Sequence, residues 1–137
     1  MAQIVPFTIP MSPSSAVVSF GPPEGYRWHL LRATLVLVTS AAAGTRSVIL
    51  DASLSLEQGK YGADRYLTTG DQSTVSSTFT ASLATQSPGP TGLGRTLTLI
   101  NRPPIFGHMD TLQLSPTLVS GDQWAFFAEF LEEEDGD

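Results

Sequence analysis

The chain has 137 residues, close to the ~150 typical of one domain, and it has no cysteine, which excludes disulfides and thiolate metal sites. Six of its thirteen acidic residues lie at or after Glu129 with no basic residue among them, and the other seven match the seven Lys and Arg. Because the body is formally neutral and the net charge of −6 belongs to the C-terminal end, no basic footprint for nucleic acid is present.

The longest mostly apolar stretch, residues 30–38, is interrupted by Arg32. It is far shorter than the ~20 residues that a membrane-spanning helix needs. Prolines near the N-terminus interrupt any secretory signal. We therefore expect a protein that neither enters a membrane nor carries an export signal in this sequence.

Residues 1–14 (MAQIVPFTIPMSPS) contain three prolines, which exclude a helix and disfavour a central strand. The segment is nevertheless apolar, unlike a flexible linker. It is predicted to be an extended N-terminal arm that lies on a hydrophobic surface, either its own or that of a neighbour. The residues expected to anchor this arm on a partner are Ile4, Val5, Phe7 and Ile9.

Three strands are predicted next along the chain. Residues 15–20 form a short strand that ends at a Gly-Pro-Pro-Glu-Gly turn. Residues 26–39 begin with an alternating pattern and then become apolar on both faces, which indicates burial on two sides. Residues 46–57 alternate cleanly between apolar and polar side chains. The short loop between the two long strands predicts a β-hairpin.

The second half of the chain is predicted to hold weaker and shorter strands. Residues 58–71 indicate a surface segment, 72–84 a weak strand, 87–94 an irregular loop, 95–101 and 111–114 short strands, and 123–131 the last strand. Aromatic residues on both faces of the last strand imply cover on both sides, so we expect an oligomer interface there. Its candidate residues are Trp124, Phe126, Phe127 and Phe130.

The pattern as a whole predicts an all-β protein: an antiparallel β-sandwich of seven or eight strands, jelly-roll-like, with an extended N-terminal arm. The expected organisation is an arm at 1–14, a sandwich domain at 15–131 and an acidic, solvated tail at 132–137.

The sequence contains no convincing catalytic or metal-binding motif. His29 lies on the polar face of a predicted strand, and His108 lies in a loop two residues before Asp110, where it could join a triad or bind a metal. The acidic end lacks the spacing of a calcium loop. We therefore expect no enzyme, no metal and no cofactor, and a cupin-like metalloenzyme is the least supported alternative.

A second alternative is a carbohydrate- or receptor-binding module. Tyr26, Trp28 and Trp124 could form a sugar-stacking platform. The loops at 87–94 and 103–110, or Tyr61, could contribute to such a site.

Residues 25–33 (GYRWHLLRA), 46–50 (RSVIL), 114–116 (LSP) and 119–124 (VSGDQW) resemble the small β-sandwich structural proteins of tailed bacteriophages. These include capsid decoration proteins, which cement the shell, and head or tail fibre modules. The resemblance implies a virion protein, commonly trimeric, made in the host cytoplasm and bound to the outer capsid surface through the major capsid protein or another virion protein. The N-terminal arm would be its clamp.

Overall fold

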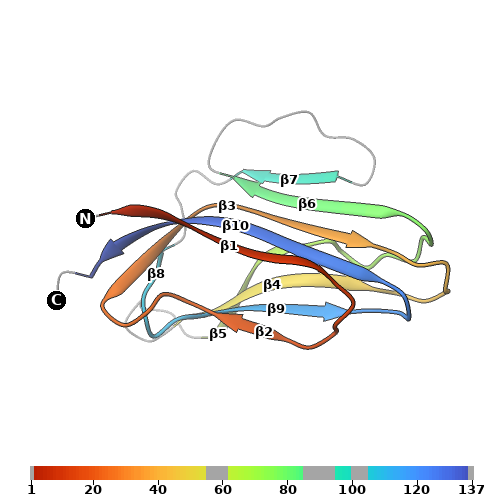
Figure 1. The fold of residues 1–137 in the computed structure, drawn as a ribbon, viewed down its shortest axis with the longest axis horizontal. Coiled ribbons are helices and arrows are strands. Elements are labelled where there is room, and N and C mark those ends of the chain that lie inside the picture. Colours follow the sequence, from red (N-terminus) through yellow and green to blue (C-terminus); the bar gives the residue numbers. More distant parts are fainter. Residues whose placement is uncertain (1, 55–61, 85–94, 100–104, 136–137) are drawn as a thin grey trace.

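The computed structural model describes residues 2–54, 62–84, 95–99 and 105–135. Within these ranges the chain consists of ten β-strands and has no helix. The strands form two sheets that pack face to face, so the predicted all-β sandwich is confirmed (Figure 1).

The larger sheet has the strand order β1-β10-β3-β6-β7, and β8 pairs with β3 beside this path. All of its neighbours are antiparallel except β6 and β7. Its strands are β1 (Gln3–Ser12), β3 (Tyr26–Val38), β6 (Thr78–Ala84), β7 (Arg95–Leu99), β8 (Ile105–Phe106) and β10 (Gln123–Glu134).

The smaller sheet is antiparallel throughout and has the order β2-β9-β4-β5. Its strands are β2 (Val18–Phe20), β4 (Ser47–Leu54), β5 (Gly62–Thr68) and β9 (Thr111–Thr117). The segment 58–71, predicted only as a surface segment, contributes β5.

Apolar side chains from the facing sides of the two sheets form one core. In β3 the buried positions change parity, because Trp28 and Leu30 point inward and then Ala33 does, followed by Leu35 and Leu37. The pairing with β10 shifts at this point and leaves Leu31 as an extra residue, a β-bulge. The bulge accounts for the change of parity, while Val36 and Val38 point outward and are half-buried, so the predicted burial on two sides is only partial.

The predicted hairpin between the two long strands is wrong. β3 belongs to the larger sheet and β4 to the smaller one, so residues 39–46 cross between the sheets as an arch. A loop of this length can close either a hairpin or an arch, so the length alone does not decide between them. The buried Arg46 at the end of the loop, described below, holds the arch.

Four connections cross between the sheets at the same end of the sandwich. They are residues 13–17, 39–46, 69–77 and 118–122, and together they form what we call the arch end (Figure 1). The N- and C-termini lie at the opposite end (Figure 1).

Candidate interaction surface

The predicted arm is an edge strand of the chain's own sheet. β1 pairs with β10 from Gln3↔Glu132 onward, and the side chains of Val5, Phe7 and Ile9 pack against the core. Ile4 points away from the core and is 60% exposed. In this structure the arm therefore lies on a surface of its own chain.

Aromatic packing fastens β1 to the sandwich. The ring of Phe7 stacks on Phe20 of the smaller sheet with a centroid distance of 4.0 Å, and it lies 6.1 Å from Phe126 of β10. At the end of β1, the indole Nε1 of Trp124 donates a hydrogen bond of 2.7 Å to the carbonyl oxygen of Ser14. β1 therefore closes one side of the core.

The prolines of β1 fit its edge position. Pro6 lies opposite Glu129, and because proline has no N–H it can occupy only a position whose amide points away from β10. Pro10 lies within the register irregularity between Ile9 and Ser12 and likewise has no N–H to offer. An edge blunted in this way resists the addition of another strand.

The four aromatic interface candidates of β10 separate into two groups. Trp124, Phe126 and Phe130 are buried in the chain's own core. Phe127 points to the outer face of the larger sheet, where it is 36% exposed and the Arg32 guanidinium lies 5.4 Å from its ring centre. Phe127 is thus the candidate of the four whose side chain is at the surface.

A shallow groove of about 300 Å³ lies beside Phe127 on this outer face. A register irregularity of β1 between Ile9 and Ser12 borders the groove. The lining is mostly apolar and includes Pro10, Met11, Val36, Ala125 and Phe127.

The carboxylates expected in a solvated tail are paired with β3 instead. β10 continues to Glu134, so Glu132 to Glu134 belong to a strand. Glu132 accepts a hydrogen bond of 2.8 Å from the indole of Trp28, and Glu133 pairs with both Arg27 and His29. The hydrogen bond with His29 lowers the pKa of Glu133 below its usual value, and the positive charge of Arg27 acts in the same direction.

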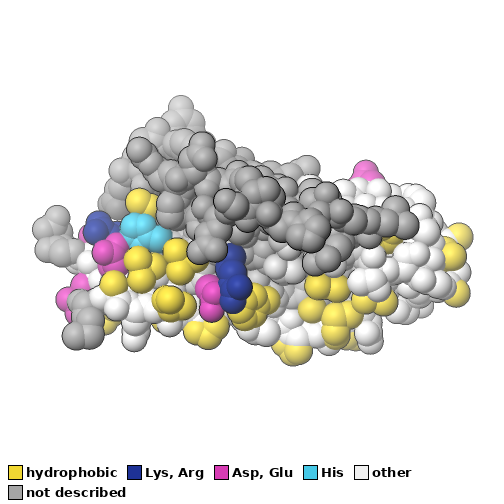
Figure 2. Space-filling view, turned by 90° about the horizontal axis from the view of Figure 1, so that it is seen from above, with side chains coloured by type: hydrophobic (Ala, Val, Ile, Leu, Met, Phe, Trp, Pro, Cys, Tyr) yellow, Lys and Arg dark blue, Asp and Glu magenta, His cyan; other side chains and the backbone are white. Residues whose placement is uncertain are grey.

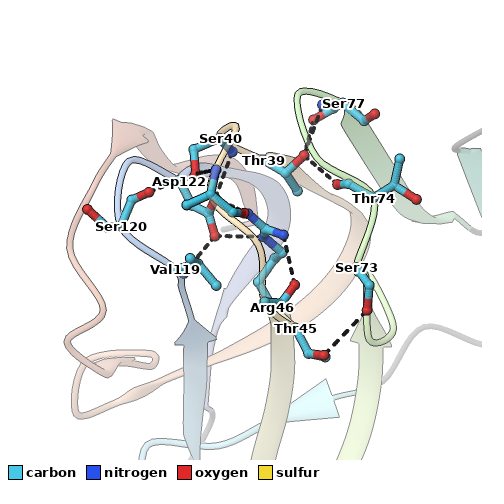
Figure 3. A network of polar contacts seen from close by, with 12 residues as sticks. Thr39, Ser40, Thr45, Arg46, Ser73, Thr74, Ser77, Val119, Ser120 and Asp122 are labelled. Carbon is cyan, nitrogen blue, oxygen red and sulfur yellow. Dashed lines mark hydrogen bonds and ion pairs between the residues drawn. The ribbon is translucent and has the colours of Figure 1, made fainter.

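A buried ion pair, not foreseen from the sequence, lies at the arch end (Figure 3). The Arg46 Nε and Nη2 atoms each donate to the Asp122 carboxylate at 3.0 Å, and both side chains are fully buried. Nη1 also donates to the carbonyl oxygen of Gly44, and Nη2 to that of Ala42, each at 2.8 Å. Asp122 also accepts hydrogen bonds from the amides of Ser40 and Val119.

Every polar atom of this pair has a partner, which a buried charge requires. Burial acts to raise the pKa of Asp122, but the hydrogen bonds from Arg46 and from the amides of Ser40 and Val119 outweigh it. They hold the pKa of this carboxyl well below its usual value. The hydrogen bond to Asp122 in turn raises the pKa of Arg46.

Further hydrogen bonds join three of the four arches (Figure 3). The Thr39 hydroxyl donates to the carbonyl oxygen of Thr74 at 2.8 Å and accepts from the amide of Ser77. The Ser40 hydroxyl donates to the carbonyl oxygen of Ser120 at 2.7 Å. The sequence signal for this network is an arginine at the start of an apolar strand and a Gly-Asp turn before the last strand.

Gly121 allows two arches to approach each other closely. Its φ is +89°, and a Cβ atom at this position would lie 3.0 Å from the Cβ of Ser40. Both the backbone conformation and the space therefore favour glycine here.

The two histidines are in separate surroundings. His29 lies on the outer face of the larger sheet beside Glu133. His108 lines an open pocket of about 270 Å³ with Ser19 and Asp110, and the Asp110 carboxylate accepts a hydrogen bond from the Gly107 amide. Within the described ranges, no three His, Asp or Glu side chains are placed to hold a metal ion.

The proposed sugar-stacking platform is not exposed as a unit. Trp28 and Trp124 are buried, and Tyr26 is half-buried. Tyr61 and the loop 87–94 lie outside the described residues, as does the first part of the loop 103–110.

No protein-family profile, curated protein or solved structure matches this chain. The described part of the chain holds no helix that could cross a bilayer.

Proposed function

We propose that this chain is a structural virion protein, a capsid decoration (cementing) protein of a tailed bacteriophage that binds the outer capsid surface. The observation that carries the proposal is the strand order. Taken with the resemblance described above, it favours a jelly roll, an architecture that viral capsid domains use.

The strand pairs nest as in one long hairpin rolled into two sheets. β1 pairs with β10, β2 with β9, β3 with β6 and β4 with β5, all antiparallel. The roll then joins β10 to β3 and β9 to β4. This nesting is the basis for assigning a jelly roll, with β7 and β8 as additions between β6 and β9.

Because β1 belongs to the chain's own sheet, its role in this proposal differs from that of a free clamp. As an edge strand, β1 stabilises the subunit, and its outward side chains, including Ile4, are those available to a neighbour. The outer face around Phe127 is the surface we propose for contact between copies in a homo-oligomer, a trimer. Such a protein strengthens a shell by binding and needs no catalytic site.

The direct test is to purify particles of the virus that encodes this chain and to identify their proteins by mass spectrometry. We expect the chain in stoichiometric amounts. Particles from a strain with the gene deleted should bind the purified protein and pellet with it, and they should gain resistance to heat. Absence of the chain from purified particles, or no binding to the deleted particles, would overturn the proposal.

A further inference from the structure

On β1, β10 and β3 of the larger sheet, the outward charged side chains lie in the half of the sheet near the termini. Successive rows across β1, β10 and β3 carry Arg27 with Glu133, then His29, then Arg32 with Glu129. From the row of Phe127 to the arch end, the outward residues of these strands are uncharged. In Figure 2, most of the visible charged side chains lie in the half that holds the termini, and one acidic side chain is visible toward the opposite end.

The arch end continues this uncharged half. Within its four connections, which are all described, Arg46 and Asp122 are fully buried against each other. Asp71 is the one charged side chain that these connections expose. A surface poor in charge is typical of the centre of a protein–protein interface, and it fits neither nucleic acid nor an anionic membrane.

Exposed apolar side chains lie on the same end. Val75 in the connection 69–77 is 42% exposed and Val17 in the connection 13–17 is 55% exposed. Met11, near the end of β1, is also exposed and lines the groove beside Phe127. The arch end therefore exposes apolar side chains and, within its four connections, Asp71 as its one charged side chain.

The loops of the arch end are held in one arrangement before any partner binds. The buried pair of Arg46 and Asp122, with the hydrogen bonds of Thr39 and Ser40, fixes three of the connections relative to one another. A preorganised surface loses less conformational entropy on binding than a flexible one.

We infer that the arch end is the docking face of this protein and that its partner is a folded protein surface that is itself poor in charge. This inference rests on the proposed function, in which the partner is the outer surface of the capsid shell. The opposite end, with its ion pairs and both termini, then faces solvent.

Two matched variants test the inference. Val75→Lys places a charge on the arch end, and Ile105→Lys places the same charge at a side chain that is equally exposed, 42%, away from the arch end. The probe is the shell from the gene-deleted virus, and binding is measured by pelleting of labelled protein. We expect Val75→Lys to bind roughly tenfold more weakly or worse, because an unpaired charge must be desolvated, and Ile105→Lys to bind like the wild type.

Because the chain has no cysteine, a bulky thiol label can be placed at one position at a time. A polymer label on Ala43→Cys should block binding, and the same label on Glu24→Cys should not. If the wild type binds but the Val75 and Ala43 variants bind equally well, the docking face is wrong while the proposed function stands. If the wild type does not bind, or binds only through nuclease-sensitive nucleic acid, both are overturned.

Discussion

Arg46 and Asp122 are 76 positions apart in the sequence, yet their side chains form a bidentate pair that is closed to solvent. The geometry is demanding, because both charges lose their hydration and every donor and acceptor must find a partner. The carbonyl oxygens of residues 42 and 44 and the amides of residues 40 and 119 supply those partners. The pair therefore holds the backbone of the arches in one arrangement.

Removing one partner should be costly. Asp122→Ala leaves a buried guanidinium without its counter-charge, and we expect the free energy of unfolding to fall by about 3–5 kcal/mol. The matched control, Asp71→Ala, removes an exposed carboxylate and should change it by less than about 0.5 kcal/mol. Urea unfolding followed by tryptophan fluorescence measures both. A loss below about 1 kcal/mol for Asp122→Ala would contradict the structural role of the pair.

The same carboxylate predicts a pH dependence of stability. Because the pKa of Asp122 is lower in the folded chain than in the unfolded one, its contribution is complete above the unfolded pKa of about 3.9 and is lost as the pH falls toward the folded pKa. The loss should reach about 1.4 kcal/mol per pH unit in that window.

Comparison with Asp122→Asn isolates this group. The difference in unfolding free energy between wild type and variant should shrink between about pH 5 and about pH 3, because the other titrating groups cancel. A difference that stays constant over this range would show that Asp122 does not titrate as described.

At the scale of elements, β1 carries an aromatic ring that closes the core. Phe7→Ala removes the ring stacked on Phe20, and we expect a loss of roughly 2 kcal/mol or more, somewhat below the value for a fully buried ring. Ile4→Ala, on the exposed side of the same strand, should cost less than about 0.5 kcal/mol. Equal effects in thermal unfolding would mean that β1 does not pack as described.

Because β1 packs on the core, truncation cannot separate the role of the arm in binding from its role in folding. Deletion of residues 1–13 would expose Phe20 and Phe126, so lost binding could reflect a damaged fold. A cysteine pair avoids the problem, because Thr8 and Phe127 lie directly opposite each other on β1 and β10.

Oxidation of Thr8→Cys/Phe127→Cys should give a disulfide within one chain, seen as a monomer on a non-reducing denaturing gel. Covalent dimers or larger species formed from dilute protein would instead indicate that β1 pairs with the β10 of another copy.

The sequence predicted some elements well and others not, for identifiable reasons. The clean alternation of residues 46–57 predicted β4, and the alternation around Trp28 predicted the inward face of β3. Proline argued against a central strand at residues 1–14, which is correct, but it left open an edge strand, where its missing N–H is tolerated. The path of residues 39–46 and the partner of Arg46 depend on contacts far away in the sequence, so no local pattern contained them.

At the scale of the whole molecule, the protein has two different ends and an outer sheet face with an apolar groove. If copies meet through that face, light scattering of the purified protein should give a mass of three times the 14.6 kDa of one chain. Phe127→Ser should then give the mass of one chain while leaving the circular dichroism spectrum unchanged, since Phe127 lies outside the core. A wild-type protein with the mass of one chain would contradict the proposed trimer.

We propose that this chain is a shell-binding virion protein that docks through its arch end. Cryo-electron microscopy of particles that carry the protein tests it most directly. We expect density for a two-sheet sandwich on the outer surface of the shell. The end that holds Arg46 and Asp122 should lie against the capsid protein, and both termini should point toward solvent. Particles without this density, or a sandwich bound by its opposite end, would contradict the account.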